Sequence, residues 1–226
     1  EAARKALRRL GARKLKTTEV PVLYPAPLAR SLFGHFVAAI GGGSLYRKAS
    51  FLVDAKGEQV FSDRLQLREE PLIPRGLASA AYDSEGVATA SRELVRDGVL
   101  QDYVLGSYYA RKLGLESTGN AGGIHNLVVQ DTGESDEDLL AGMQRGLLLC
   151  ELMGQGVNGV TGDYSRGAAG FWVEDGEIQY PVAEITVAGN LRDMYRTIEA
   201  VSRDTDLRGG IRTGSVLVGR MTIAGS

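Results

Sequence analysis

The segment SLFGHFVAAIGGG, residues 31–43, resembles the metal-binding helix of a zinc protease with part of its chemistry removed. Zincins hold the metal with two histidines on one helix and use a neighbouring glutamate to activate the bound water. Here His35 is followed by Phe36, and the positions for a second histidine hold Ala39 or, at a spacing one residue longer, Ile40. Because a lone imidazole is no zinc site, the residue types predict neither a catalytic residue nor a metal ligand here. His35 lies at the rim of the apolar stripe, where a histidine usually packs its ring and hydrogen-bonds one nitrogen.

Two further residues have side chains that can do chemistry. His125, in NAGGIHNLVV, is the only other histidine, and the sequence leaves open whether it meets His35 and a carboxylate in space. Cys150, the only cysteine, is surrounded by leucines, which favours a small buried hydrophobic residue with a raised pKa over a nucleophile. A single cysteine excludes an internal disulfide, so we expect a reducing compartment, the cytoplasm.

A third candidate is the glycine-flanked stretch TGDYSRGAAG, which contains Asp163, Tyr164, Ser165 and Arg166. Ser165 has no G-x-S-x-G context, so the stretch is interpreted as a loop that forms a substrate or partner surface. The stretches IGGGSLYRK and NAGGIH lack the glycine spacing of phosphate-binding motifs and predict turns instead.

Composition narrows the class of protein. The 226 residues carry a net charge of −2, 43% hydrophobic residues and 30 glycines. A net charge of −2 does not attract the phosphate backbone of a nucleic acid. No apolar run is long enough to span a bilayer. We therefore expect neither a nucleic-acid partner nor a membrane. The cationic opening stretch, residues 1–16, predicts an amphipathic helix that packs on another element, and its start in mid-helix is interpreted as that of a fragment.

Local signals predict the elements that must position these residues. Helices are expected at residues 27–40, at 135–144 after a serine N-cap, and at 190–202. Two Asp-Gly pairs, Asp97-Gly98 and Asp175-Gly176, predict β-hairpins. Further strands are expected at residues 19–24, 51–61, 125–130 and 214–225. Together these elements predict an α+β fold, a mostly antiparallel β-sheet or partly closed barrel with a few flanking helices, in one domain covering residues 1–226.

Longer motifs identify a family. The stretches LFGHFVAAIGGGSLYRKASF, ARKLGLESTGNAGG, LMGQGVNGVTGDYSRGAAGFWVEDGEIQYPVAEITVAGNLRDM and GSVLVGRMTIAG occur in this order. With them the sequence resembles the TldD/PmbA family, in particular the C-terminal half of its PmbA (TldE) branch. The match covers nearly the whole chain.

The resemblance implies a heterodimeric metalloprotease, made of a TldD-like and a PmbA-like subunit, that cleaves peptides and unstructured segments. In the TldD-like subunit an H-E-x-x-x-H helix and a later cysteine hold the zinc. At the corresponding helix positions this chain has His35, Phe36 and Ile40, and the stretch aligned with the cysteine, residues 206–215, contains none. His35 is thus expected to be a vestige, with no cofactor in this chain and the zinc in the TldD-like partner.

These observations lead to one expected function and two alternatives. The expected function is that of a non-catalytic subunit domain that needs its TldD-like partner and helps to enclose a chamber. One alternative is an independent metal-dependent hydrolase that uses His35, His125 and carboxylates. The other is a regulatory interaction module, because the family has also been described as a modulator of DNA gyrase.

Overall fold

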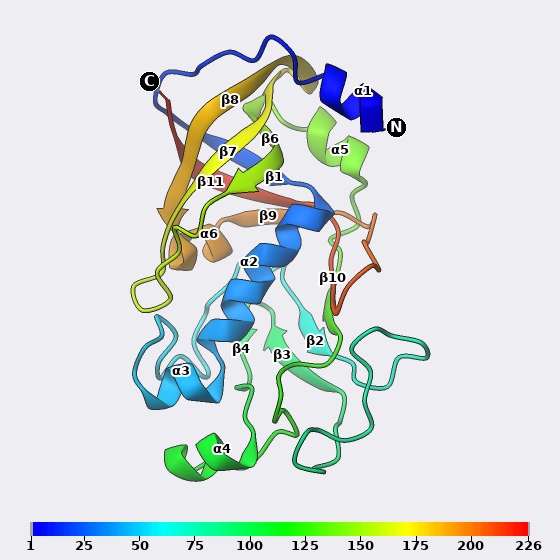
Figure 1. The fold of residues 1–226 in the computed structure, drawn as a ribbon, viewed down its shortest axis with the longest axis vertical. Helices are drawn as coiled ribbons and strands as arrows, with labels where there is room; N and C mark the ends of the chain where they lie inside the picture. Colours follow the sequence, from blue (N-terminus) through cyan, green and yellow to red (C-terminus); the bar gives the residue numbers. More distant parts are fainter. Residues whose placement is uncertain (1, 226) are drawn as a thin grey trace.

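The structure, a computed structural model, describes residues 2–225, without the side chains of residues 2, 4 and 5. Figure 1 shows a β-barrel at one end, a second sheet at the other, and α2 lying along both. The helices are α1 (Ala2–Leu7), α2 (Ala26–Ala39), α3 (Gly42–Tyr46), α4 (Ser107–Leu113), α5 (Asp136–Ala141) and α6 (Leu191–Arg196). The strands are β1 (Thr18–Tyr24), β2 (Leu67–Glu69), β3 (Arg92–Arg96), β4 (Val99–Leu100), β5 (Leu127–Val129), β6 (Arg145–Met153), β7 (Asp163–Glu174), β8 (Glu177–Asn190), β9 (Ile198–Val201), β10 (Ile211–Arg212) and β11 (Val216–Ala224).

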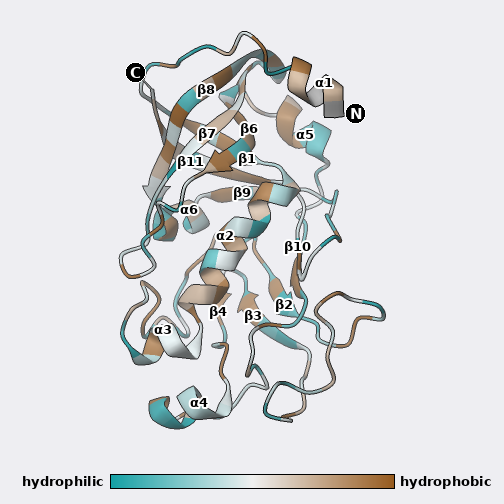
Figure 2. Cartoon of the chain, in the orientation of Figure 1, coloured by the Kyte–Doolittle hydropathy of each residue, from teal (hydrophilic) through white to brown (hydrophobic). Residues whose placement is uncertain are grey.

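The barrel consists of β1, β6, β7, β8 and β11, and pairing of β1 with β11 closes it. Adjacent strands of the barrel are antiparallel, except that β1 and β6 are parallel. Strand β9 pairs with β11 and adds a sixth strand to this sheet. The long β7–β8 hairpin turns at Asp175 and Gly176, whose φ angles of 48° and 76° are those of a type I′ turn. Figure 2 shows hydrophobic and hydrophilic residues alternating along β8, as expected for a strand with one face in the core.

The second sheet has the order β10-β5-β2-β3-β4 and is antiparallel apart from the β10–β5 pair. Its β3–β4 hairpin turns at Asp97 and Gly98, with φ angles of 49° and 74°. One cluster of buried side chains includes Leu147 of the barrel, Phe36 of α2 and Leu94 of the second sheet. The α+β class, the partly barrel-like sheet and both predicted hairpins are therefore confirmed.

Two of the predicted helices differ from the prediction at their ends. The helix expected at 27–40 is α2, displaced by one residue at each end. The helix expected at 135–144 is α5, which begins with a Ser135 capping box and ends before Gly142. Both are confirmed as elements, and only their ends were misjudged.

The prediction of one helix over residues 190–202 is wrong in its second half. Asn190 caps α6 as expected, but the helix ends at Arg196, and Ile198–Val201 form β9. The β-branched residues of this segment pair with Val216–Val218 of β11, so sheet pairing overrides the helical periodicity.

The strand predicted at residues 51–61 is also wrong. This segment is a series of turns, with left-handed φ angles at Asp54 (58°) and Gly57 (87°). Phe51, Leu52 and Phe61 are buried as a strand pattern would require, because they anchor the turns in the core. The apolar residues of this segment resemble those of a strand in the sequence, but they do not alternate regularly with polar residues.

The amphipathic opening helix is confirmed for residues 2–7 only. Leu7 and Leu10 are 63% and 71% exposed, so no element among the described residues covers their apolar stripe.

Candidate functional site

The candidate site is centred on α2, the helix that carries the degenerate zinc-protease pattern. Pro27 occupies its first turn, and the N–H of Ile40 donates to the Phe36 carbonyl at the C-terminal end. Leu32, Phe36 and Ile40 are all buried, so this face of the helix packs in the core.

The side chains at the expected glutamate and second-histidine positions are part of that core. Phe36 and Ile40 each have 0% exposure. Phe36 packs edge-on against Phe61 with ring centroids 4.9 Å apart, and against Tyr195 at 6.3 Å. Tyr195 in turn donates its hydroxyl hydrogen to the Leu32 carbonyl, 2.7 Å away. These two motif positions now stabilise the fold.

His35 points from the same helix toward β7. Its ring meets that of Tyr164 edge-on, with centroids 6.3 Å apart and planes at 76°. Its Nε2 atom is buried and has no hydrogen-bond partner among the described residues. Nε2 therefore does not make the hydrogen bond that was expected of one ring nitrogen, and its aromatic neighbour is Tyr164.

The stretch Asp163 to Arg166 is the beginning of β7 and not the loop expected from the sequence. Strand alternation divides it. Asp163 and Ser165 are exposed, whereas Tyr164 is 1% exposed and Arg166 is half-buried on the same side. Asp163 accepts hydrogen bonds from Thr161 and Asn190, which lower the pKa of its carboxyl. Only the two inward residues join His35.

The electrostatics around His35 are unfavourable for a cation. Burial, and then the charge of Arg166, lower the pKa of His35. Burial raises the pKa of Tyr164, and the nearby Tyr24 and Arg166 partly oppose this shift. The Tyr24 hydroxyl donates to the Met221 sulfur at 3.2 Å and the Arg166 Nε to the Gly154 carbonyl at 3.1 Å. The Tyr164 hydroxyl itself is buried and has no hydrogen-bond partner among the described residues.

These residues do not fit the zinc ion that the helix pattern suggests. A catalytic zinc needs three protein ligands, but Ile40 and Phe36 offer no donor atom and Arg166 places a positive charge beside the remaining imidazole. Within residues 2–225, no three His, Cys, Asp or Glu side chains come close enough together to hold a metal ion.

The stretch 206–215, aligned with the cysteine of the metal site, does lie against α2. Asp206 forms an ion pair with Arg30 of α2 at 2.7 Å, and its other carboxylate oxygen accepts from Arg208 at 3.0 Å. The hydroxyl of Ser215 accepts a hydrogen bond from the N–H of Ala26, the first residue of α2. An ion pair and a backbone hydrogen bond therefore hold this segment against α2.

This ion pair leads to a prediction about acid stability. Hydrogen bonds from the Arg208 side chain and backbone, together with the Arg30 charge, lower the pKa of Asp206 from 3.8 to about 2. A depressed folded-state pKa stabilises the protein above about pH 4, and this contribution is lost as the pH falls toward 2. We expect Asp206→Asn to remove no more than about 2 kcal/mol at neutral pH, and to make acid unfolding shallower in this interval. Urea unfolding at several pH values measures both, and a variant curve parallel to the wild-type curve contradicts the assignment.

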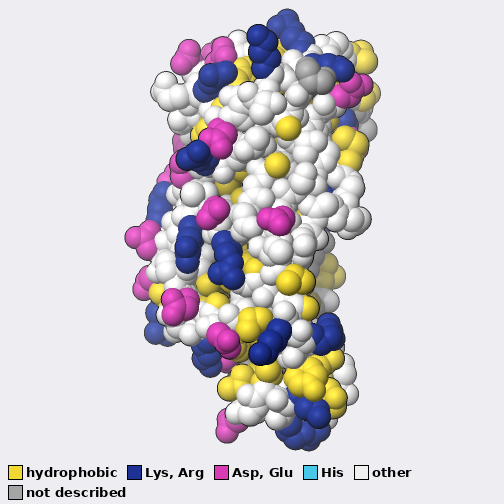
Figure 3. All heavy atoms as spheres, turned by 90° about the vertical axis from the view of Figure 1, so that its left-hand side faces the viewer, with side chains coloured by type: hydrophobic (Ala, Val, Ile, Leu, Met, Phe, Trp, Pro, Cys, Tyr) yellow, Lys and Arg dark blue, Asp and Glu magenta, His cyan; other side chains and the backbone are white. Residues whose placement is uncertain are grey.

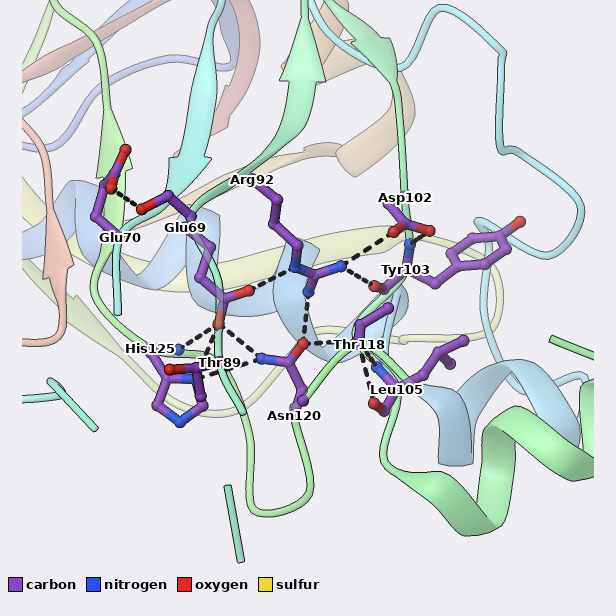
Figure 4. Close-up of polar contacts among 12 residues, drawn as sticks. Glu69, Glu70, Thr89, Arg92, Asp102, Tyr103, Leu105, Thr118, Asn120 and His125 are labelled. Atoms are coloured by element: carbon purple, nitrogen blue, oxygen red, sulfur yellow. Dashed lines mark hydrogen bonds and ion pairs between the residues drawn. The ribbon is translucent and has the colours of Figure 1, made fainter. Parts of the chain in front are cut away.

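His125 lies in a different cluster, shown in Figure 4, and makes no contact with His35 among the described residues. Its N–H and Nδ1 lie 2.8 Å and 3.1 Å from Oε1 of Glu69, which is 1% exposed. Arg92 donates to Glu69 Oε2 at 2.7 Å and to Asn120 Oδ1 at 2.6 Å. Asn120 Nδ2 closes the ring of contacts with Glu69 Oε1 at 2.6 Å. The structure thus places the two histidines, which the hydrolase alternative needs together, in separate clusters.

This network joins β2, β3 and the loop before β5, and no sequence motif predicts it. Glu69 reads as one of two adjacent exposed acids in LREEPL, and only tertiary packing reveals that it is buried. Cys150, in β6, is half-buried, and desolvation raises the pKa of its thiol, in agreement with the sequence-based interpretation.

Two glycine stretches that were predicted as turns come together at a cleft of about 530 Å³. Its lining includes Gly41, Gly42 and Gly43 at the start of α3, Gly122 and Gly123, and the aromatic residues Tyr108 and Tyr109 of α4. Figure 3 shows hydrophobic side chains gathered at this end of the molecule, where Tyr46 and Tyr108 are 44% and 52% exposed.

No helix among the described residues has both the length and the apolar character needed to cross a membrane.

A closed barrel joined to a second sheet, with a helix that keeps one residue of a zinc-protease motif, defines a class of metalloprotease relatives. Residues 17–225 match the PmbA/TldA metallopeptidase C-terminal domain. The chain belongs to the PmbA/TldD metalloprotease family.

Individual relatives agree with this assignment. "Metalloprotease PmbA" of Escherichia coli O157:H7 is 55% identical over 225 residues, which cover 100% of this chain and 50% of that protein. A solved structure of a candidate modulator of DNA gyrase from Bacteroides thetaiotaomicron superposes with a TM-score of 0.95 at 30% identity, covering 100% of this chain and 51% of the other. TldE from Thermococcus kodakarensis gives a TM-score of 0.86 at 28% identity, covering 99% and 54%. The chain therefore spans about half the length of the relatives that it matches.

Proposed function

We propose that this chain is a domain of the non-catalytic, PmbA/TldE-type subunit of a heterodimeric TldD/TldE zinc metalloprotease. One observation supports the proposal most strongly. Phe36 and Ile40, which occupy the glutamate and second-histidine positions of the motif, are fully buried in the core, and the charge of Arg166 acts on His35. The zinc and the water that it activates then belong to the TldD-like partner, and this chain supplies structure.

The role of the subunit is to form part of a chamber in which peptides and unstructured segments are cleaved. Related subunits offer each other pseudo-symmetric surfaces and can together enclose a space that one subunit leaves open. Support comes from the similarity to a protein named TldE and to others named metalloprotease PmbA. Residues 1–226 act in this proposal as a single domain, located in the cytoplasm.

Peptides bound along this chain are held in the proposal as an added β-strand, through main-chain hydrogen bonds. The barrel is closed by the β1–β11 pairing, and residues 57–59 already hydrogen-bond to the outer edge of β4, so the proposal places the added strand at β10, the other outer strand of the second sheet. The cleft beside α3 is lined by glycines and tyrosines, and the glycines allow a peptide to approach the backbone of this chain closely. In the proposal this cleft forms part of the chamber wall.

The direct test uses the complete gene product and its TldD-like partner. We expect the two to copurify in a pull-down, and a casein-derived peptide mixture to be cleaved by the complex but by neither this subunit nor a zinc-depleted complex. Peptide cleavage by the isolated subunit would contradict the proposal and favour the independent hydrolase.

The DNA gyrase modulator alternative rests on the description of solved relatives. In that case the subunit binds a regulatory target and leaves peptide cleavage by the partner unchanged. Peptidase rates measured with and without this subunit separate the two functions, since only the proposed one requires it.

Arg166 gives a prediction for the complex. Because its side chain is half-buried beside α2 and has no carboxylate partner among the described residues, Arg166→Ala is expected to weaken assembly or to lower peptide cleavage two- to tenfold. Wild-type values in both the pull-down and the cleavage assay would remove the assignment of this residue to a functional surface.

A further inference from the structure

Hydrogen-bond donors that have no acceptor meet where α2 faces the start of β7. Tyr164 is 1% exposed, yet within the part of the chain that the structure describes neither its hydroxyl nor the buried Nε2 of His35 has a hydrogen-bond partner. The two rings are in contact, with centroids 6.3 Å apart. Buried polar atoms are nearly always paired, so two unpaired atoms on adjacent side chains indicate a missing ligand.

Arg166 completes the arrangement. It lies two residues beyond Tyr164 on the same side of β7, opposite Val187, which has 0% exposure. Its Nε donates to the Gly154 carbonyl at 3.1 Å, and no carboxylate among the described residues pairs with its guanidinium. Its charge acts on both neighbours, lowering the pKa of His35 and opposing the burial-induced rise in the pKa of Tyr164. The three side chains together can offer a guanidinium, a phenol O–H and an imidazole N–H.

The chemistry of these groups selects the ligand. A metal cation is repelled by the guanidinium, and a neutral carbonyl oxygen accepts at most two hydrogen bonds and leaves the guanidinium charge without a counter-ion. A carboxylate has two oxygens that accept several hydrogen bonds and matches the planar geometry of arginine. It would also meet the neutral imidazole in the tautomer that carries its proton on Nε2. Arg166 is half-buried and has the longest side chain of the three, so its side chain is the part that shifts to admit the ligand.

We propose that Arg166, Tyr164 and His35 form a binding site for a carboxylate of a peptide, either its C-terminal group or an acidic side chain. The inference rests on the proposed function, because it assumes that this subunit contacts the peptides that the complex cleaves. In this proposal the helix position that carries zinc in a protease binds the negatively charged carboxylate of the peptide. Tyr164 and His35 act as binding residues and take no part in bond cleavage.

The test measures peptide binding to the intact complex with its zinc removed, so that no cleavage occurs. Three versions of one fluorescent, unstructured peptide are compared: a free acid with an internal glutamate, its C-terminal amide, and a version with glutamine in place of the glutamate. We expect removal of one of the two carboxylates to weaken binding by about tenfold or more, since hydrogen bonds to charged groups are strong. The peptide that loses affinity identifies the source of the carboxylate.

Variants assign the effect to this site. Arg166→Gln should abolish the preference for the carboxylate-bearing peptide, and Tyr164→Phe should reduce it without lowering the thermal midpoint, because it removes only an unpaired hydroxyl. Arg96→Gln is the matched control, since Arg96 is an exposed arginine of the second sheet paired with Glu93. The control should keep the wild-type preference.

Each outcome has a definite meaning. Equal affinity for all three peptides in the wild type, or a preference that survives Arg166→Gln, overturns the carboxylate site and leaves the proposed subunit function intact. Absence of peptide binding overturns the site as well, and the peptidase assay on the zinc-loaded complex then decides separately on the proposed function.

Discussion

Replacing Arg92 by alanine is expected to lower the free energy of unfolding by about 3–5 kcal/mol, because it leaves a buried carboxylate without its counter-ion. The carboxylate is that of Glu69, 1% exposed, which accepts from Arg92 Nε at 2.7 Å. The same guanidinium also contacts Asn120 and the Tyr103 carbonyl, so its loss leaves several buried groups unpaired (Figure 4). The network fixes the loop that carries His125 against the second sheet.

Urea unfolding near neutral pH measures this effect, and two further variants make it specific. Arg96→Ala, in the same strand, removes an exposed ion pair and should leave the unfolding midpoint unchanged. The double variant Glu69→Gln with Arg92→Gln should recover part of the loss, since no buried charge then remains. A change below about 1 kcal/mol for Arg92→Ala would show that the network contributes little to stability.

Restoring the zinc-protease motif is expected to fail. The variant Phe36→Glu with Ile40→His places a carboxylate within an aromatic cluster and an imidazole in the core. We expect it to lose at least about 3–5 kcal/mol of stability and to gain no stoichiometric zinc. The reason is that both side chains have 0% exposure, and Phe36 packs against Phe61 and Tyr195.

The single variants keep this prediction testable if the double variant does not fold. Phe36→Leu is the matched control, because it preserves an apolar side chain, and it should remain folded with a lower thermal midpoint. Ile40→His alone should bind no zinc at micromolar concentrations in equilibrium dialysis. A folded double variant with one tightly bound zinc per chain would show that the helix still presents these positions to a metal site.

The sequence predicted those parts of the fold that local signals decide. Helix α2 followed from the spacing of Leu32, Phe36 and Ile40, and the two hairpins followed from Asp-Gly pairs that adopt left-handed φ angles. Strand β9 was missed because its pairing with β11 depends on a partner distant in the sequence. Closure of the barrel by β1 and β11 has the same non-local origin.

The candidate site was predicted in pieces. His35 and the residues Tyr164 and Arg166 were selected separately, the first for its motif and the others for their glycine-rich surroundings. That they meet depends on the tertiary contact between His35 of α2 and Tyr164 of β7, which leaves no signal in either segment. The burial of Glu69 was equally invisible, because an acidic residue next to a second acid resembles an exposed pair.

The central claim is that this chain belongs to the subunit without metal, and zinc stoichiometry tests it most directly. Zinc is measured in the complete gene product alone, in its complex with the TldD-like subunit, and in the same complex carrying His35→Ala. We predict no stoichiometric zinc in the isolated subunit, and a single zinc ion per heterodimer that is unaffected by His35→Ala. One zinc ion per copy of this subunit, lost on His35→Ala, would contradict the account.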